Sequence, residues 1–231
     1  MGATPMSSDT ELFQVLTGIV KTTLPKFSHR WKAKVWIYKV IGPVVGLFNK
    51  RFLTDYITTL YPHVDWPQEH PENDDWTWKV FGHEFVHLSD TKRLSLRYVL
   101  AYGFPQIFTP LALLAFLAFW KIWFLVCLSF LLCVAPWPAP GRTWAELRGY
   151  TMSMAVNLWR YGDVQETTID WIVPQFTGWA YYRMCPNEKK IRDQLTKAVQ
   201  SVRDGSILTP PENEPFRVVY QMLKDRGETV I

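Results

Sequence analysis

WKVFGHEFVHL, at residues 78–88, carries two side-chain patterns that one helix would place on different faces. Its large apolar residues recur at three- and four-residue spacing, as an amphipathic helix requires: Trp78, Phe81, Phe85 and Leu88. His83 and His87 stand four residues apart and would share another face of the same helix. The stretch therefore predicts a helix that packs on one side and presents two imidazoles on another.

The pentad at residues 83–87, His-Glu-Phe-Val-His, predicts a zinc site. Two neutral imidazoles one helical turn apart can bind one zinc ion at about 2.0–2.1 Å. Glu84 would lie beside the ion, where it can take a proton from a bound water molecule as a general base. Asp90 shares the histidine face, and we expect it to accept a hydrogen bond from an imidazole and so fix its tautomer.

A catalytic zinc ion usually takes three protein ligands and keeps a position for water, so two histidines are not enough. Residues 144–159 predict a second helix, with a face of polar and small residues on an otherwise apolar rod: Glu146, Gly149, Tyr150, Ser153 and Asn157. We predict Glu146 as the third ligand and Tyr150 as a hydrogen-bond donor to an oxyanion. Asp90, His63 and Asp163 are alternatives for the third ligand.

Residues 107–134 hold a single charge, Lys121, among Leu, Phe, Ala and Trp, which predicts an element embedded in lipid. A single span would separate His83 from Glu146 by a bilayer, so a hairpin is preferred. Its tip at Trp120, Lys121 and Trp123 suits a membrane interface. A hairpin that dips only part-way into lipid and a buried hairpin of a soluble domain are the alternatives.

Two prolines and the flanking charges add detail to the hairpin. Pro105 and Pro110 predict a kinked first arm. Basic residues flank the apolar segment on both sides, which favours two cytoplasmic ends: Lys92, Arg93, Arg97, Arg142 and Arg148. No cleavable signal is visible and the cysteines show no metal or disulfide spacing, so we expect a membrane-associated protein whose soluble part faces the cytoplasm.

The N-terminal part is strongly basic. Between Leu12 and Thr54 there are eight basic residues and no acidic residue, interleaved with Trp, Tyr, Ile and Val. Such a stretch suits an anionic lipid surface, and the alternative is a helix that packs on its own domain. No nucleic-acid-binding motif is present, so nucleic acid is not an expected partner.

Residues 82–87 followed by Glu-Leu-Arg-Gly-Tyr at 146–150 resemble the small gluzincin class of zinc metallopeptidases, over about residues 52–161. The resemblance implies a short sheet before the active helix, whose edge strand binds an extended peptide. Residues 52–66 are rich in β-branched and aromatic residues, consistent with strands joined by a turn. The expected substrate strand contains Ile57, Thr58, Thr59 and Leu60.

These observations predict an α+β, mainly helical fold: a small zincin-like core of sheet and helices, with a hydrophobic helical hairpin between the two metal-ligand helices. The expected domains are a basic, amphipathic N-terminal helical region (1–51), a zincin-like metal-binding domain (52–161) interrupted by the hairpin (98–137), and a C-terminal helical cover or partner-binding region (162–231).

The expected function is that of a membrane-associated zinc-dependent peptidase, which hydrolyses a peptide bond with metal-activated water. Its expected partners are a peptide or protein substrate and membrane lipid. Two alternatives stand beside it. One is a non-catalytic, membrane-anchored structural protein that keeps a zincin scaffold within a larger protein assembly. The other is a metal-dependent amide hydrolase that acts at the membrane or cell envelope.

Overall fold

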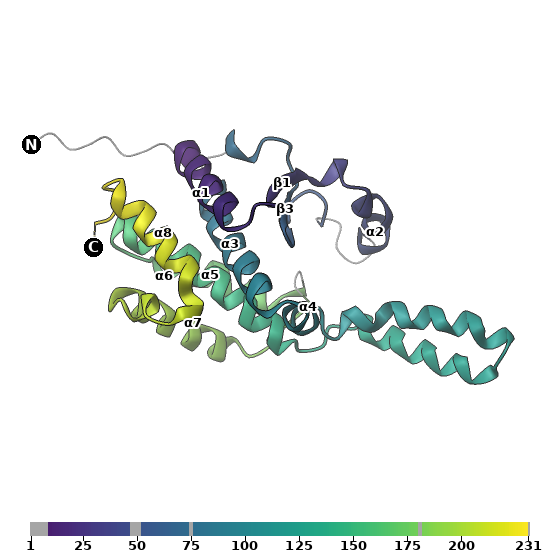
Figure 1. The fold of residues 1–231 in the computed structure, drawn as a ribbon. Helices are drawn as coiled ribbons and strands as arrows, with labels where there is room; N and C mark the ends of the chain where they lie inside the picture. The colour runs from purple at the N-terminus through teal and green to yellow at the C-terminus, as the bar shows by residue number, and fades with distance from the viewer. Residues whose placement is uncertain (1–8, 47–51, 74–75, 180–181, 231) are drawn as a thin grey trace, which may run out of the picture. The chain divides into compact units, whose positions relative to one another are not determined.

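The computed structural model describes residues 9–46, 52–73, 76–179 and 182–230, shown as a ribbon in Figure 1. The described residues are mainly helical with one small sheet, which agrees with the predicted α+β class. They form two compact units. Unit 1 takes the chain up to Arg93, residues 148–164 and the chain from Ala198, and unit 2 takes residues 94–147 and 165–197. Residues 1–8 and 47–51 of the predicted N-terminal region lie outside the described residues.

Unit 1 holds the sheet and the helix of the histidine motif. Its main elements are α1 (Asp9–Thr23), β1 (Ser28–Trp31), α2 (Trp36–Gly46), β2 (Thr58–Leu60), β3 (His63–Trp66), α3 (Thr77–Leu94), the second half of α5 (Pro140–Tyr161) and α8 (Glu214–Asp225). Short 3-10 helices lie at Lys32–Lys34, Pro71–Asn73, Ser206–Leu208 and Pro211–Asn213. The apolar stripe predicted for α3 is fully buried in the core of this unit.

The sheet has the strand order β1-β3-β2. β2 pairs antiparallel with β3, with Thr59 opposite Val64, so the predicted strands joined by a turn are confirmed. β1 pairs parallel with β3 and was not predicted, because residues 28–31 were assigned to a helical region. Its register places Arg30 opposite Asp65, and the guanidinium donates to both carboxylate oxygens at 2.6 and 2.7 Å. A charge pattern alone does not reveal such a distant partner.

The N-terminal region packs on its own unit. Helix α1 buries Leu12, Phe13, Leu16 and Val20 in the core of unit 1. Lys32, predicted as part of a lipid-facing surface, is 2% exposed, and its ammonium donates to the carbonyls of Phe52 (2.9 Å) and Tyr56 (2.7 Å). Helix α1 and Lys32 therefore pack within unit 1, whereas Trp36 and Val40 of α2 are 71% and 63% exposed, and contact of this region with lipid stays a prediction.

Unit 2 carries the predicted apolar hairpin. Its elements are α4 (Leu96–Gly103), the 3-10 helices η3 (Gln106–Phe119) and η4 (Ile122–Val134), the first half of α5, α6 (Glu166–Thr177) and most of α7 (Glu188–Arg203). The arms η3 and η4 meet at Trp120 and Lys121, as predicted. The chain bends by 84° between α4 and η3, so the hairpin covers 106–134 rather than 98–137. Pro105 stands at this bend, where proline cannot continue a helix.

The hairpin exposes apolar side chains along both arms. Ala112 is its one buried residue, whereas Phe116, Phe119 and Val126 are 72%, 97% and 73% exposed. The described chain therefore does not bury it as the core of a soluble domain would. Among the described residues, no single helix is long and apolar enough to cross a membrane, and the bent pair α4 and η3 meets that test together by length and composition.

The C-terminal residues 162–231 do not form one separate cover. Helix α6 and most of α7 belong to unit 2, whereas α8 belongs to unit 1. Four residues of α8 lie in the core of unit 1: Phe216, Val219, Met222 and Leu223. Helix α8 is thus an integral part of the fold that holds α3.

Candidate metal site

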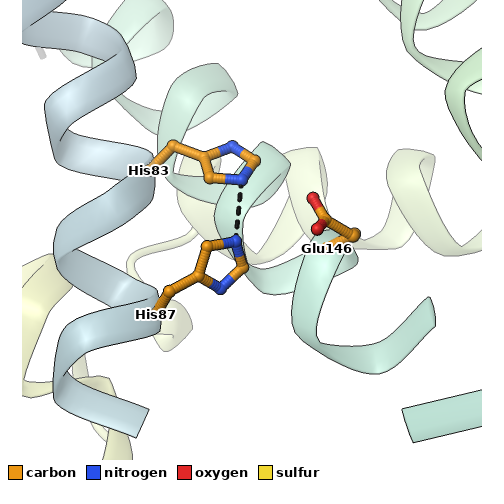
Figure 2. Close-up of side chains that lie close together, drawn as sticks. All are labelled: His83, His87 and Glu146. Carbon is orange, nitrogen blue, oxygen red and sulfur yellow. Dashed lines mark hydrogen bonds between the residues drawn. The ribbon is translucent and has the colours of Figure 1, made fainter. Parts of the chain in front are cut away.

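Helices α3 and α5 supply a buried group that could hold a metal ion: His83, His87 and Glu146. One ligand atom of each residue lies within 4.8 Å of the others, and the two imidazole Nε2 atoms are 3.0 Å apart (Figure 2). Two ligands bound tetrahedrally at the usual zinc distance are about 3.3 Å apart, so the imidazole pair has a suitable spacing. Two histidines and one carboxylate form a ligand set of catalytic zinc sites. Zinc itself remains a prediction.

Local interactions fix the start and end of α3. The helix begins at Thr77, whose buried hydroxyl donates to the carbonyl of Pro71 at 2.6 Å. Lys92 and Arg93 lie in its last turn, where positive charge suits the helix dipole. Ser95, with a φ of 50°, then separates α3 from α4. The histidines thus sit in the middle of a helix that is defined at both ends.

Helix α5 accommodates His83 through one glycine. A Cβ atom added to Gly149 would lie 2.4 Å from His83 Nε2, closer than side chains ever pack. The ring of Tyr150 meets the His83 ring edge-on, with centroids 4.9 Å apart. The predicted polar and small-residue face of α5 therefore does receive an imidazole. Gly149 was predicted on this face, but without a role of its own.

Glu146 is held by a residue that sequence analysis missed. The hydroxyl of Tyr102 in α4 donates to Glu146 Oε1 at 2.6 Å, and Glu146 is 4% exposed. A carboxylate can accept a hydrogen bond through one oxygen while the other binds an ion. Tyr102 lies in the segment assigned to the lipid-embedded arm. The one sequence signal for its role at the site was a polar hydroxyl within that apolar segment.

Glu84 lies beside the predicted substrate strand. The hydroxyl of Thr59, in the edge strand β2, donates to Glu84 Oε2 at 2.5 Å, and Glu84 is 7% exposed. Burial lowers the pKa of Lys32 to about 8, although the charges of Asp65 and Glu84 partly oppose that shift. The residue predicted as the base and the strand predicted to bind substrate therefore meet in unit 1.

Asp90 takes a different role from the one predicted. Its buried carboxylate accepts hydrogen bonds from Arg148 at 2.7 and 3.2 Å and from Arg93 at 3.2 Å, rather than from an imidazole. Arg148 also donates to the Asn213 side chain at 2.7 Å. Since Arg148 belongs to α5, Asp90 ties α3 to the helix that carries Gly149 and Tyr150.

The remaining predicted residues are not members of the metal-binding group. His63 in β3 hydrogen-bonds Ser28 at 2.9 Å, and Asp163 forms an exposed ion pair with Arg203 at 3.1 Å. Thr58, Thr59 and Leu60 form β2, and Ile57 directly precedes it. Trp120 and Trp123 are 85% and 82% exposed at the hairpin tip, on either side of Lys121. Of the flanking arginines, Arg142 is buried and Arg148 is hydrogen-bonded to Asp90, and the cytoplasmic location of both ends stays a prediction.

No protein-family model, no curated protein and no solved structure matches this chain. The comparisons therefore assign no family, and the resemblance to gluzincins stays a prediction. A buried imidazole pair with a carboxylate ligand and a neighbouring glutamate is suited to activating water for attack on a carbonyl group.

Proposed function

We propose that this protein is a membrane-associated zinc-dependent peptidase. The observation that carries the proposal is the buried group of His83, His87 and Glu146, with Glu84 next to His83 in the same helix. A zinc ion bound there would polarise the scissile carbonyl and lower the pKa of a water molecule. A structural zinc site needs no neighbouring base, so Glu84 supports a catalytic use.

Glu84 acts as the proton carrier in this proposal. Its carboxylate takes a proton from the attacking water and then donates it to the leaving nitrogen. Thr59 hydrogen-bonds one carboxylate oxygen of Glu84 and so limits its rotation. The Tyr150 hydroxyl, on a ring packed against His83, is the proposed donor to the developing oxyanion.

The edge strand β2 is the proposed substrate-binding element. An extended peptide can add to an edge strand through main-chain hydrogen bonds. β2 ends the described sheet, and Thr59 in its centre contacts Glu84. A peptide aligned along β2 would therefore bring a main-chain carbonyl close to the base. The apolar hairpin supports the membrane association, because its exposed side chains are unfavourable in water.

The test compares zinc content with hydrolysis in matched variants. We expect Glu84→Gln to keep stoichiometric zinc and to lower the rate of peptide hydrolysis by roughly 10²–10⁴-fold. Alanine variants of His83, His87 and Glu146 should lose zinc, measured by mass spectrometry of the metal. Asp163→Asn is the control, because this carboxylate was an alternative ligand and lies outside the group.

Three results would count against the proposal. Retention of zinc in Glu146→Ala would remove that residue from the ligand set. Stoichiometric zinc in the wild type without cleavage of any randomised peptide would favour the non-catalytic assembly protein. Release of a lipid-derived amine from vesicles would instead favour the amide hydrolase.

A further inference from the structure

The base of the hairpin is closed by a small set of hydrogen bonds within unit 2. The side chain of Gln106, the first residue of η3, donates to the carbonyl of Ala135 at 3.1 Å, just after the end of η4. Arg142 donates to the Gln106 side chain at 2.9 Å and to the carbonyl of Tyr102 at 3.1 Å. We call Tyr102, Gln106, Ala135 and Arg142 the hairpin base.

The hairpin base is directly connected to the proposed ligand Glu146. Arg142 precedes Glu146 by four residues in α5, which corresponds to about 6 Å along the helix axis. Tyr102 donates its hydroxyl to Glu146 Oε1 at 2.6 Å. Within the hairpin base, Arg142 is therefore about one helical turn from Glu146, and Tyr102 is hydrogen-bonded to Glu146.

The chemistry of the hairpin points to lipid as its partner. Its exposed apolar side chains lie along both arms, whereas a protein groove would cover one face. Its single charge, Lys121, lies at the tip between Trp120 and Trp123, a combination suited to headgroup depth. At about 2.0 Å per residue, the 14-residue and 13-residue arms are roughly 28 and 26 Å long. That length is close to the hydrocarbon thickness of about 30 Å, so the hairpin base would lie at a membrane surface.

Resting on the proposed peptidase function, we infer that the substrate is a polypeptide anchored in the same membrane and cut close to the lipid headgroups. With the hairpin base at the membrane surface, Glu146 lies about one to two helical turns from that surface. An extended chain covers about 10–15 Å in three to four residues. The bond that is cut is then separated from the anchor by only a few residues.

The first experiment compares anchored with free substrate. Randomised decapeptides are attached to a lipid by a spacer of two or of twenty Gly-Ser residues, in phosphatidylcholine and phosphatidylglycerol vesicles, and the same peptides are supplied in solution. We expect the short-spacer peptides to be cut roughly a hundredfold faster than free peptides, because both partners share one surface. Equal rates, or an advantage confined to the long spacer, would overturn the inference.

Hairpin variants distinguish the advantage of anchored peptides from the hydrolysis reaction itself. Phe116→Asp and Val126→Asp place a charge in the exposed centre of each arm and should abolish the advantage of anchored peptides. Their hydrolysis of free peptides should match the wild type. Trp171→Asp is the control, since it replaces an aromatic residue of unit 2 outside the hairpin that is 64% exposed. Absence of hydrolysis of both free and anchored peptides by the wild type would refute the proposed function instead.

A second readout does not depend on hydrolysis. Co²⁺ bound in place of zinc quenches fluorophores over short distances, so vesicles carry a fluorophore on the headgroup. We expect quenching by the Co²⁺-loaded wild type and none by His83→Ala, which should hold no Co²⁺. Failure of the wild type to sediment with vesicles would overturn the inference. So would sedimentation with Co²⁺ bound and no quenching.

Discussion

At the scale of the residue, the absent side chain of Gly149 decides whether His83 can keep its position. Replacing Gly149 with Ala would place a Cβ 2.4 Å from His83 Nε2, and both residues lie in the middle of helices. The imidazole must then move. We expect Gly149→Ala to lose zinc while remaining helical, since Ala favours a helix by about 1 kcal/mol over Gly.

The measurement for Gly149→Ala is zinc content together with the circular dichroism spectrum. Gly18→Ala is a matched control, because Gly18 lies inside α1 and an added Cβ meets nothing within 4 Å. This control should keep its zinc and melt at an equal or higher temperature. Stoichiometric zinc in Gly149→Ala, held as tightly as in the wild type, would contradict the packing of α5 against His83.

His29 predicts how stability depends on pH. It lies among aromatic rings of unit 1, and its Nδ1 accepts a hydrogen bond from the Trp66 indole at 2.9 Å. Burial, aided by the charge of Lys21, lowers its pKa to about 4 from an ordinary 6.5. The unfolded chain therefore takes up the proton first, so stability falls as pH drops from about 6.5 towards 4. The loss amounts to roughly 2 kcal/mol by pH 5.

Urea unfolding of the metal-free protein at pH 7 and pH 5 tests this prediction. His29→Gln should start less stable, because it loses the packing of the imidazole, but its stability should fall less on acidification. EDTA in all samples removes any contribution from bound metal. An identical decrease in the two proteins would show that His29 is not the titrating group.

At the scale of the element, regular helices were predictable and distant pairings were not. The apolar residues of α3 recur with helical spacing, and so do those of α5, whose polar face indicated Glu146. β1 could not be recognised, since it is defined by pairing with β3, 35 residues further on. The hydrogen bond from Tyr102 to Glu146 was also not predicted, because the two residues are 44 apart in the sequence and α4 resembles a continuation of the apolar segment.

Tyr102 in helix α4 contacts the site through its hydrogen bond to Glu146, which Tyr102→Phe would remove. The Glu146 carboxylate would then lose a donor that orients it, so we expect zinc affinity to fall by roughly 10–100-fold. Competition with a chelating dye measures the change. Tyr161→Phe, at the exposed end of α5, should leave affinity unaltered. Equal dissociation constants for Tyr102→Phe and the wild type would show that the bond does not orient the ligand.

At the scale of the whole molecule, unit 1 is assembled from three separate stretches of chain. α5 meets both α1 and the C-terminal residues at Arg160, which is 6% exposed. Its guanidinium donates to Asp9 at 2.5 Å and to Glu228 at 2.8 Å. Nothing in the local sequence distinguishes Arg160 from surface arginines, because its partners are 151 and 68 residues away. Contacts of this kind join residues that are far apart in the sequence and form only in the completed fold. Sequence patterns therefore cannot predict them.

Glu228→Ala tests whether this closure stabilises unit 1. The change leaves a buried guanidinium with one of its two carboxylates, and breaking a buried pair costs about 3–5 kcal/mol. Because Asp9 remains as a partner, we expect the loss to lie near the lower end of this range. The free energy of unfolding by urea, followed by tryptophan fluorescence, measures it. Arg203→Ala, which breaks the exposed pair with Asp163, should cost less than about 1 kcal/mol. Adding Arg160→Met to Glu228→Ala should restore part of the loss, since it removes a buried charge that has lost one of its partners. If the Glu228 variant were no less stable than the Arg203 variant, the closing role of Arg160 would be wrong.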